Sequence, residues 1–393
     1  MRSHLTSPAK ARAAAALAAV TVALSVIAGF AASSGGAPVD QQSDVQAVSF
    51  GNTSSPSLYW GAWIGDQLNG TKPPYDMSAV EQFEAMVGKG LSILEWSLPF
   101  ARCADFTRCP PYSFPAAEMN RVRGHGAIPM LSWSSDAGGG VNQPDFQLSD
   151  VISGRYDSLI RSFASGAKSW GHPFFLRFNW EMNGNWFAWS ERANGNRPGE
   201  FVAAWRHVHD IFTQVGATNA TWVWCPYADL GYGFTYDDSL YPGDSYVDWT
   251  CVDAYNWGAG PKVDSPWRSF DELFRANYLR ITRDLAPGKP MMIGEFASSD
   301  YGGNKAAWIR NTLARLAKLP SAYPKIYAFV WFDVDDRSSH WPIEDSPASI
   351  KAFRAGIGSD AFVPNQDRFK QIESRPIQPL PPRQSDYNLD AGD

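Results

Sequence analysis

The sequence of 393 residues predicts an α/β protein built around one (β/α)8 TIM barrel, which we place at residues 57–360. Three observations support this fold class. Eight short β-rich runs are apolar almost throughout, as is typical of strands that helices cover on both faces. Segments with the apolar spacing of amphipathic helices lie between several of these runs. The alternation extends over about 300 residues, which suits a barrel of eight β/α units.

The predicted strands and helices follow one another in a regular order. The strands are LYWGAWIG (58–65), LSILEWSL (91–98), AIPMLSW (127–133), FFLRFNW (174–180), TWVWCPY (221–227), DWTCVDAYN (248–256), PMMIGEFA (290–297) and IYAFVWFD (326–333). The helices span residues 77–87, 149–167, 198–215, 270–285 and 304–316. Pro198 begins one helix and Gly216 follows its end, as start and stop residues do. The alternative fold is a doubly wound open sheet, but WIGDQLNG after the first strand lacks the GxGxxG spacing of its phosphate-binding turn.

The two ends of the chain lie outside the predicted barrel. Residues 1–37 begin with a basic stretch, continue with an uncharged run rich in Ala, Val and Leu, and end in small residues that offer cleavage sites. This pattern predicts a signal peptide and a secreted protein without membrane contact after cleavage. If the run stays uncleaved, it is long enough to anchor the protein in a membrane. Residues 38–56 are expected to form a flexible leader and residues 361–393 a flexible tail, because both lack an apolar period.

Composition excludes some kinds of partner and favours others. The 34 Lys and Arg residues against 40 Asp and Glu give a net charge of −6, so a nucleic acid partner is not expected. Aromatic residues reach 14% of the chain, more than an aliphatic core requires, and flat aromatic rings stack well on sugar rings. The six His residues are scattered and no CxxC spacing occurs, so neither a metal ion nor a cofactor is predicted.

Four cysteines in a chain with a predicted export signal suggest disulfide pairing. Cys103 and Cys109 enclose the short loop CADFTRC, whose closure is sterically easy. Cys225 and Cys251 lie in two successive predicted strands. This second pair forms either another disulfide or two buried free thiols.

Polar residues near the carboxyl ends of the predicted strands are the first candidates for a functional site, because the active sites of such barrels gather there. They are Asp66, Glu95, Glu181, Asp253, Tyr255, Glu295 and Asp333. Glu181 and Glu295 stand out, since each lies at the end of a strand, the fourth and the seventh, among aromatic, Gly and Asn residues. One such Glu alone is more often an exposed loop carboxylate, but two in an aromatic-rich barrel favour a shared site.

A pair of Glu residues can cleave a glycosidic bond without a metal ion. One carboxylic acid protonates the departing oxygen, and a second carboxylate meets the positive charge that develops at the sugar carbon. Inward side chains on the fourth and seventh strands could approach to about 5 to 5.5 Å, the geometry of a retaining hydrolase. The apolar neighbour Trp180 disfavours the charged form of Glu181, as an acid requires. Tyr255 and Arg177 could stabilise the negative charge of Glu295, as a nucleophile requires.

Four stretches of the sequence carry a resemblance to a known family. They are RFNWEMNGNWFAW (177–189), YPGDSYVDWTCVDAYNW (241–257), MIGEFAS (292–298) and FVWFD (329–333). In this order, over residues 58–355, they resemble glycoside hydrolase family 26, the retaining β-mannanase family of the large (β/α)8 glycosidase clan. The EMNG motif followed by W-x-x-W is the specific part of this resemblance, whereas GEF alone is weak. The resemblance implies Glu181 as acid/base and Glu295 as nucleophile.

The same resemblance assigns roles to residues that would contact the substrate. It implies that Tyr255 is the hydroxyl beside the nucleophile and that Arg177 orders the site. It also implies that Trp186 and Trp331 are sugar platforms near the cleaved bond. The chain departs from the family at Trp180, since mannanases of this family usually carry His immediately before the acid/base. A Trp there changes the polar contacts around the leaving group and with them the basis for sugar preference.

The predicted function is therefore a secreted retaining endo-β-glycanase that acts as a monomer on a polysaccharide, with β-1,4-mannan as the first substrate. Mixed-linkage β-glucan and β-xylan are alternatives within the family. A transglycosylase that processes exported polysaccharide shares the first chemical step, so sequence does not separate it from a hydrolase. A non-catalytic carbohydrate-binding barrel is disfavoured, because such a module needs neither an acid nor a nucleophile.

Overall fold

The computed structural model describes residues 55–103, 109–261, 263–365 and 374–383, which belong to the compact unit Gly51–Asp393. The predicted signal peptide, residues 1–37, lies outside the described residues, as does the predicted leader except for its last two residues. Among the helices of the described residues, none is long and apolar enough to cross a membrane.

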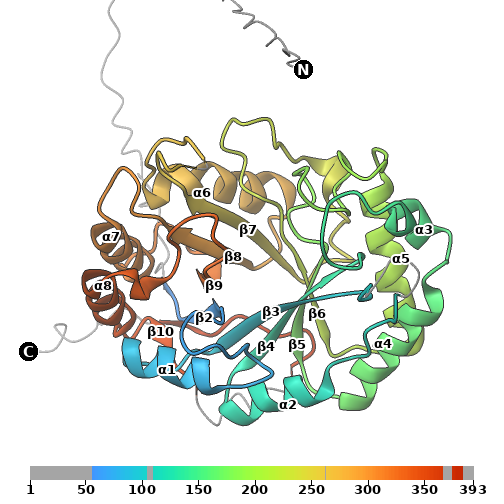
Figure 1. Cartoon of the computed structure of the whole chain (residues 1–393), viewed down its shortest axis with the longest axis horizontal. Helices are drawn as coiled ribbons and strands as arrows, with labels where there is room; N and C mark the ends of the chain where they lie inside the picture. Colours follow the sequence, from blue (N-terminus) through green and yellow to red (C-terminus); the bar gives the residue numbers. More distant parts are fainter. Residues whose placement is uncertain (1–54, 104–108, 262, 366–373, 384–393) are drawn as a thin grey trace, which may run out of the picture. The chain divides into compact units, whose positions relative to one another are not determined.

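Eight parallel strands form a closed barrel (Figure 1). They are β2 (Leu58–Ile64), β3 (Ile93–Pro99), β4 (Ile128–Ser134), β5 (Phe174–Phe178), β6 (Ala220–Trp224), β7 (Trp249–Asn256), β8 (Met291–Ser298) and β9 (Ile326–Asp333). Each strand pairs with the next, and β2 pairs with β9 from Tyr59 opposite Ala328 to Ile64 opposite Asp333, which closes the ring. The predicted (β/α)8 fold is confirmed, and the fourth and seventh barrel strands are β5 and β8.

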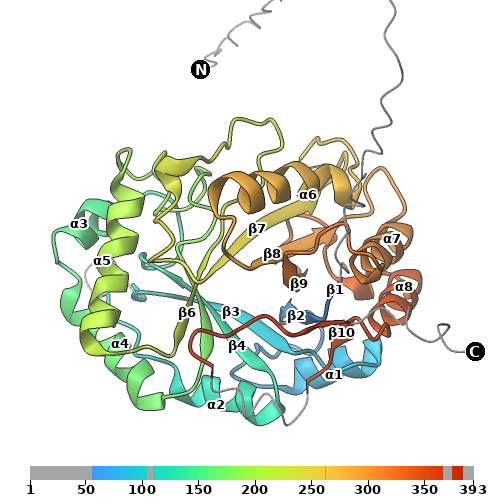
Figure 2. The same ribbon diagram turned by 180° about the vertical axis from the view of Figure 1, so that it is seen from behind.

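Helices surround the strands, as the views in Figures 1 and 2 show. They are α1 (Ser78–Val87), α2 (Ala116–His125), α3 (Leu148–Ile152), α4 (Asp157–Trp170), α5 (Glu200–Val215), α6 (Phe270–Leu279), α7 (Lys305–Ala317) and α8 (Pro347–Ile357). Short turns of helix add η1 (Pro144–Phe146), η2 (Asp238–Leu240), η4 (Ile343–Asp345) and the π-helical η3 (Arg280–Leu285) that continues α6. All five predicted helical segments are helical, but the segment 149–167 is divided into α3 and α4.

The sequence patterns missed two helices, and their residues explain why. In α2 the buried residues are Met119 and Val122, so its apolar stripe is too narrow to give a clear helical period. The division between α3 and α4 lies around Gly154, whose φ of +86° ends a helix in a way that few other residues tolerate. The second missed helix, α8, begins after Ser346, whose side chain accepts from the Ser349 backbone N–H as a cap.

The C-terminal segment differs from the expected flexible tail at the residues that the structure describes. Strand β10 (Phe362–Val363) pairs with the start of β2, and β11 (Pro382–Arg383) pairs with β1 (Ser55–Pro56). Between them Ile377 is buried; its carbonyl accepts from Trp249 Nε1 at 2.8 Å and its N–H donates to Thr221 Oγ1 at 2.9 Å. In Figure 2, the view from behind, this red segment crosses in front of the strands. A side chain and hydrogen bonds therefore hold part of the segment against the amino-terminal end of the barrel.

Both predicted cysteine pairs form disulfides, Cys103 with Cys109 and Cys225 with Cys251. The second bridge joins the end of β6 to β7, which excludes the alternative of two free thiols in this structure.

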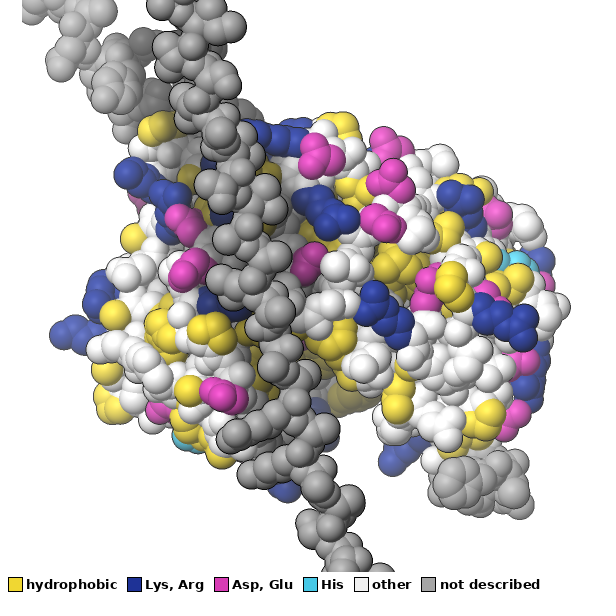
Figure 3. All heavy atoms as spheres, turned by 90° about the horizontal axis from the view of Figure 1, so that it is seen from above, with side chains coloured by type: hydrophobic (Ala, Val, Ile, Leu, Met, Phe, Trp, Pro, Cys, Tyr) yellow, Lys and Arg dark blue, Asp and Glu magenta, His cyan; other side chains and the backbone are white. Residues whose placement is uncertain are grey.

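Charged side chains of both signs are interspersed on the face of the molecule that Figure 3 shows. Lys and Arg do not gather there into one basic patch, in keeping with the formal net charge of −6. A recognition surface on this face would therefore depend on shape and hydrogen bonding more than on a field of one sign.

Candidate active site

A cleft of about 830 Å³ opens at the carboxyl ends of the barrel strands, and both Glu181 and Glu295 line it. Most of the other lining residues are aromatic. The full lining is Trp63, Ser97, Trp180, Glu181, Trp186, Phe187, Tyr227, Tyr232, Phe234, Tyr255, Trp257, Val263, Asp264, Ser265, Glu295, Phe332, Val334, Asp336 and Trp341. Two carboxyl groups in an apolar, aromatic cleft are the arrangement that the sequence predicted for cutting a sugar chain.

The turn after β5 carries Glu181 in a left-handed backbone conformation with φ of +53°. Its backbone N–H donates to the Cys225 carbonyl at 2.7 Å, which ties this strained turn to the end of β6. Asn183 strengthens the same tie, because its side chain donates to the Tyr227 carbonyl at 2.8 Å and accepts from the Tyr227 N–H at 2.8 Å. The EMNG motif thus holds the carboxyl group at the mouth of the barrel.

Glycine is required at position 184 for a local reason. A Cβ atom built on Gly184 would lie 2.5 Å from the ring of Trp186, so a larger residue would displace that ring. In the observed position Trp186 donates its indole N–H to Oε2 of Glu181 at 2.7 Å. The motif therefore places both the carboxyl group and an aromatic donor beside it.

The environment of Glu181 favours its protonated form. Burial in the cleft and the negative charge of Glu295 raise the pKa of Glu181 to about 8, against the opposing effects of the Trp186 hydrogen bond and the Arg177 charge. A carboxylic acid with this pKa is still protonated at neutral pH. Such a group can donate a proton to a leaving oxygen.

Glu295 occupies an irregular part of β8. The pairing register of β8 shifts against β7 between Val252 and Ala254, and against β9 between Ile293 and Phe296. Irregular pairing of this kind re-aims a side chain next to an active site. At Gly294 an added Cβ would lie 2.4 Å from the sulfur of Cys251, so glycine leaves room for the disulfide against β8.

Two donors meet the carboxylate of Glu295 in the cleft. The Nη2 of Arg177 donates to Oε1, and the hydroxyl of Tyr255 donates to Oε2. Both contacts stabilise negative charge on Glu295. Burial and the neighbouring charge of Glu295 raise the pKa of the Tyr255 hydroxyl well above its usual range, so this group remains a donor.

Arg177 is the cation at the centre of a buried cluster of carboxyl groups. Besides Glu295 it contacts Glu95 at 2.7 Å and Asp253 at 2.8 Å, and its Nε donates to Ser132 at 2.7 Å. The side chain of Arg177 is fully buried. One cation for three carboxyl groups leaves negative charge in excess, and burial raises the pKa of Glu95 to about 8 and that of Asp253 well above its usual range.

A family model described as Glycosyl hydrolase family 26 matches residues 141–295, the range that runs from before the EMNG motif to Glu295. The chain belongs to glycoside hydrolase family 26. Endoglucanase H of Acetivibrio thermocellus is 34% identical to it over 322 residues, which is 80% of the chain and 32% of that relative. A mannan endo-1,4-beta-mannosidase of Bacillus subtilis is 27% identical over 195 residues, which is 47% of each protein.

Solved structures agree with the fold of this family 26 chain. The catalytic domain of Bacillus sp. JAMB-750 GH26 endo-beta-1,4-mannanase has a TM-score of 0.58 and 17% identity, with 79% of the chain and 88% of that domain covered. At this identity the likeness concerns the fold alone. Against the curated relatives, the chain spans about a third of the length of Endoglucanase H and about half of the mannosidase.

Seven side chains are predicted for the family 26 site. The structure brings five of them into mutual contact, the two Glu residues and three that bond to them, and a sixth, Trp180, lies beside this group. Arg177 and Tyr255 contact Glu295, and Trp186 contacts Glu181. Trp180 lines the cleft, and its ring lies 5.0 Å from the Arg177 guanidinium. A Trp at this position thus packs on the central cation and presents an aromatic ring to the cleft.

The prediction of Trp331 as a sugar platform is wrong. Its side chain is completely buried on the outer side of β9, where its ring packs 5.3 Å from Phe353 of α8 and 5.1 Å from Phe296. Side chains alternate along a strand, so the next residue, Phe332, is the one that faces the cleft. Alternation places Trp331 and Phe332 on opposite faces of β9, but the strand is apolar up to its last residue, so no local signal tells which of the two faces the cleft.

Several cleft residues, from loops and from the end of one strand, have no motif around them in the sequence. Trp341 follows β9, and its ring lies 5.0 Å from Tyr255 and 4.6 Å from Trp257. Trp63 near the end of β2 and Tyr227 after β6 complete this aromatic wall. No short motif marks these residues, because loops of different strands meet only in the folded barrel.

Two strand-end acids on the candidate list lie apart from the Glu pair. Asp66 is largely exposed and forms an ion pair with Lys72 at 3.4 Å. Asp333 is buried and accepts from the backbone N–H of Ile343 at 2.9 Å, which anchors the loop after β9. Both have structural partners, whereas Glu95 and Asp253 join the Arg177 cluster.

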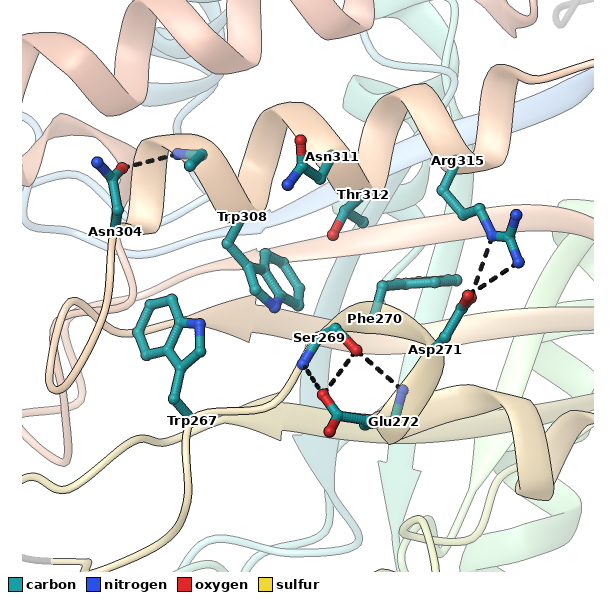
Figure 4. A pocket seen from close by; sticks show the side chains of 11 residues that line it. Trp267, Ser269, Phe270, Asp271, Glu272, Asn304, Trp308, Asn311, Thr312 and Arg315 are labelled. Atoms are coloured by element: carbon teal, nitrogen blue, oxygen red, sulfur yellow. Dashed lines mark hydrogen bonds and ion pairs between the residues drawn. The ribbon is translucent and has the colours of Figure 1, made fainter.

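A second groove of about 480 Å³ lies along α6 and α7 (Figure 4). Its charged groups already have structural partners. Asp271 pairs with Arg315 at 2.8 Å, and Glu272 completes a capping box with Ser269 at the start of α6. Both acids of this groove are therefore engaged in structural contacts, and the barrel mouth, where Glu181 and Glu295 line one cleft, is the candidate active site.

Proposed function

We propose that the protein is a retaining endo-β-glycanase that cleaves a β-linked polysaccharide by double displacement. Glu295 attacks the sugar carbon, while Glu181 gives its proton to the departing oxygen, so that a glycosyl ester forms as the glycosidic bond breaks. Glu181 then takes a proton from water, whose oxygen attacks the same carbon and releases Glu295. The observation that carries this proposal is the presence of both Glu residues in one cleft with opposite surroundings.

The surroundings support the two roles and the change of role between the steps. Glu295 accepts from Arg177 and Tyr255, which suits a group that must stay negative until it attacks. The charge of Glu295 is one cause of the raised pKa of Glu181. Formation of the ester removes that charge, so the pKa of Glu181 should fall and the same group should then serve as base.

We propose β-glucan as the first substrate and β-mannan as the second. The match to Endoglucanase H extends over 322 residues, whereas the match to the mannosidase extends over 195. Trp180, in place of the His usual in family mannanases, packs on Arg177 and offers the leaving sugar an apolar ring. A site without a polar partner gains nothing from the hydroxyl that such a partner would bind.

The test is hydrolysis of mixed-linkage β-glucan, β-mannan and β-xylan by the full chain and by the variants Glu295→Ala and Glu181→Ala. We expect cleavage within chains, products that keep the β configuration when first released, and loss of turnover in Glu295→Ala. Azide should restore turnover in Glu295→Ala, because a small anion can attack in place of the missing carboxylate, and the product should then be the α-glycosyl azide. Full activity of Glu295→Ala, or products released with inverted configuration, would contradict the mechanism.

Glu181→Ala separates the acid role from a general loss of structure. Substrates with good leaving groups need little protonation, so their cleavage should decline least in this variant. An equal loss across leaving groups would exclude Glu181 as the acid. If none of the three polysaccharides is cleaved by the unchanged protein, the proposed substrate class is wrong.

A further inference from the structure

Lys305 is a buried lysine outside the cleft, at the first position of α7. Its ammonium group donates to three successive backbone carbonyls, those of His340 at 2.6 Å, Trp341 at 3.0 Å and Pro342 at 2.6 Å. The carboxylate of Asp345 lies 3.4 Å away. An ammonium group has three N–H donors, so three converging carbonyls satisfy it completely.

The loop that these carbonyls belong to carries part of the cleft wall. The Trp341 side chain lines the cleft, and its indole N–H donates to Ser338 Oγ at 2.9 Å. Its ring packs 5.0 Å from the ring of Tyr255, whose hydroxyl donates to Glu295. A continuous set of contacts therefore runs from Lys305 through Trp341 and Tyr255 to Glu295.

The chemistry of the loop explains why a lysine is needed. Its backbone from His340 to Pro342 lies outside strands and helices. The Pro342 carbonyl also accepts from the backbone N–H of Asp345 in η4, over a long 3.5 Å. A buried carbonyl without a donor raises the free energy of the folded protein. Without the ammonium group of Lys305, the loop would therefore turn these carbonyls toward water. Such a turn would carry the Trp341 ring away from Tyr255. The ammonium group of Lys305 makes the packed arrangement of the loop the stable one.

We propose that Lys305 is a positioning residue that holds Trp341 against Tyr255 and so fixes the cleft wall beside Glu295. This inference rests on the proposed function for its effect on substrate, although the effect on the loop is independent of activity. Lys305 is too deeply packed to contact a bound sugar itself, with 4% of its surface exposed. It acts through the loop between β9 and α8.

The test compares Lys305→Met with Lys89→Met in the full chain. Lys89 is a matched control, because its ammonium also donates to backbone carbonyls, those of Ile357 at 3.0 Å and Ser359 at 2.8 Å, and it lies before β3, away from the cleft. We expect Lys305→Met to lower kcat/KM on the polysaccharide by about 10-fold to 100-fold, mainly through a higher KM, and Lys89→Met to leave KM unchanged. Lys305→Arg keeps a cation and should recover part of the loss.

A double-mutant cycle shows whether Lys305 acts through Trp341. In the Trp341→Ala background, Lys305→Met should raise KM little further, because the ring that the lysine positions is already gone. Additive losses in the double variant would contradict the proposal.

Hydrogen exchange of the free protein gives a readout that needs no substrate. Backbone amides of residues 338–345 should exchange faster in Lys305→Met, and to a smaller degree in Lys305→Arg, than in the unchanged protein or in Lys89→Met. Unchanged exchange in this segment would overturn the inference. If the unchanged protein cleaves no polysaccharide but the exchange result holds, the proposed function fails and the positioning role of Lys305 stands. If Lys305→Met does not fold, Lys305→Arg carries both measurements.

Discussion

The indole N–H of Trp186 donates to Oε2 of Glu181 at 2.7 Å. Trp186 follows Glu181 by five residues in the sequence. The bond is available to the charged and to the neutral carboxyl group, but it is stronger to the charged form. It therefore lowers the pKa of Glu181, while burial and the charge of Glu295 raise it to about 8. A Trp at this position thus limits the pH range over which the acid stays protonated.

We predict that Trp186→Phe extends activity to higher pH. Phe keeps an aromatic ring but has no N–H, so the pKa of Glu181 should rise further. The alkaline limb of the kcat/KM profile should move upward by about one pH unit, the size expected for losing one hydrogen bond to a charged group. Trp257→Phe is the control, because its indole bonds to Tyr227 and to neither Glu. An unchanged limb in Trp186→Phe would show that Glu181 does not set it.

We predict that Glu95→Gln weakens the dependence of stability on pH. Burial raises the pKa of folded Glu95 from 4.5 to about 8, so the folded protein keeps a proton that the unfolded chain releases. The stability that this group contributes is therefore complete below about pH 4.5 and is lost as the pH rises toward about 8. Gln cannot titrate, so Tm should fall less between about pH 5 and about pH 8.5 than in the unchanged protein. Equal falls in both proteins would refute this origin of the pH dependence.

Adjacent residues of β9 should have opposite effects when truncated. Trp331 packs in the layer between β9 and α8, so Trp331→Ala should lower the free energy of unfolding by about 3 to 5 kcal/mol and leave KM unchanged where the protein stays folded. Phe332 faces the cleft, so Phe332→Ala should raise KM with a smaller loss of stability. Urea unfolding and polysaccharide kinetics of both variants measure the two effects. A raised KM in Trp331→Ala would return this residue to the sugar platform that the sequence predicted.

We predict that the C-terminal segment stabilises the barrel through Ile377. Its side chain is buried against the amino-terminal end of the strands, so Ile377→Ala should lower the free energy of unfolding by about 2 kcal/mol. Gln378→Ala next to it changes an exposed side chain and should have an effect within about 0.5 kcal/mol. Urea unfolding compares the two variants. Equal stability of both would mean that the segment contributes nothing through Ile377.

The barrel could be predicted from the sequence, because each strand and most helices carry a local signal. Near-continuous apolar runs mark strands buried on both faces, and their number and spacing led to the closed ring. Glu181 and Glu295 were recognisable for a similar reason, since each lies at the end of an apolar run among aromatic, Gly and Asn residues, and this pattern is visible in the local sequence. The C-terminal segment has no apolar period, so its packing through one buried Ile377 had no comparable signal.

Contacts between distant parts of the folded chain select which aromatic residues face the cleft and what surrounds each carboxyl group. Trp331 and Phe332 are equally apolar in sequence, and the direction of β9 in the closed barrel alone turns one outward and the other into the cleft. Arg177, Glu95 and Asp253 lie on three different strands, so their mutual contacts exist only after the ring has closed. The pKa values of the carboxyl groups in the cleft depend on these long-range contacts. They could not be predicted from the sequence, because local sequence does not specify the distances between side chains of different strands.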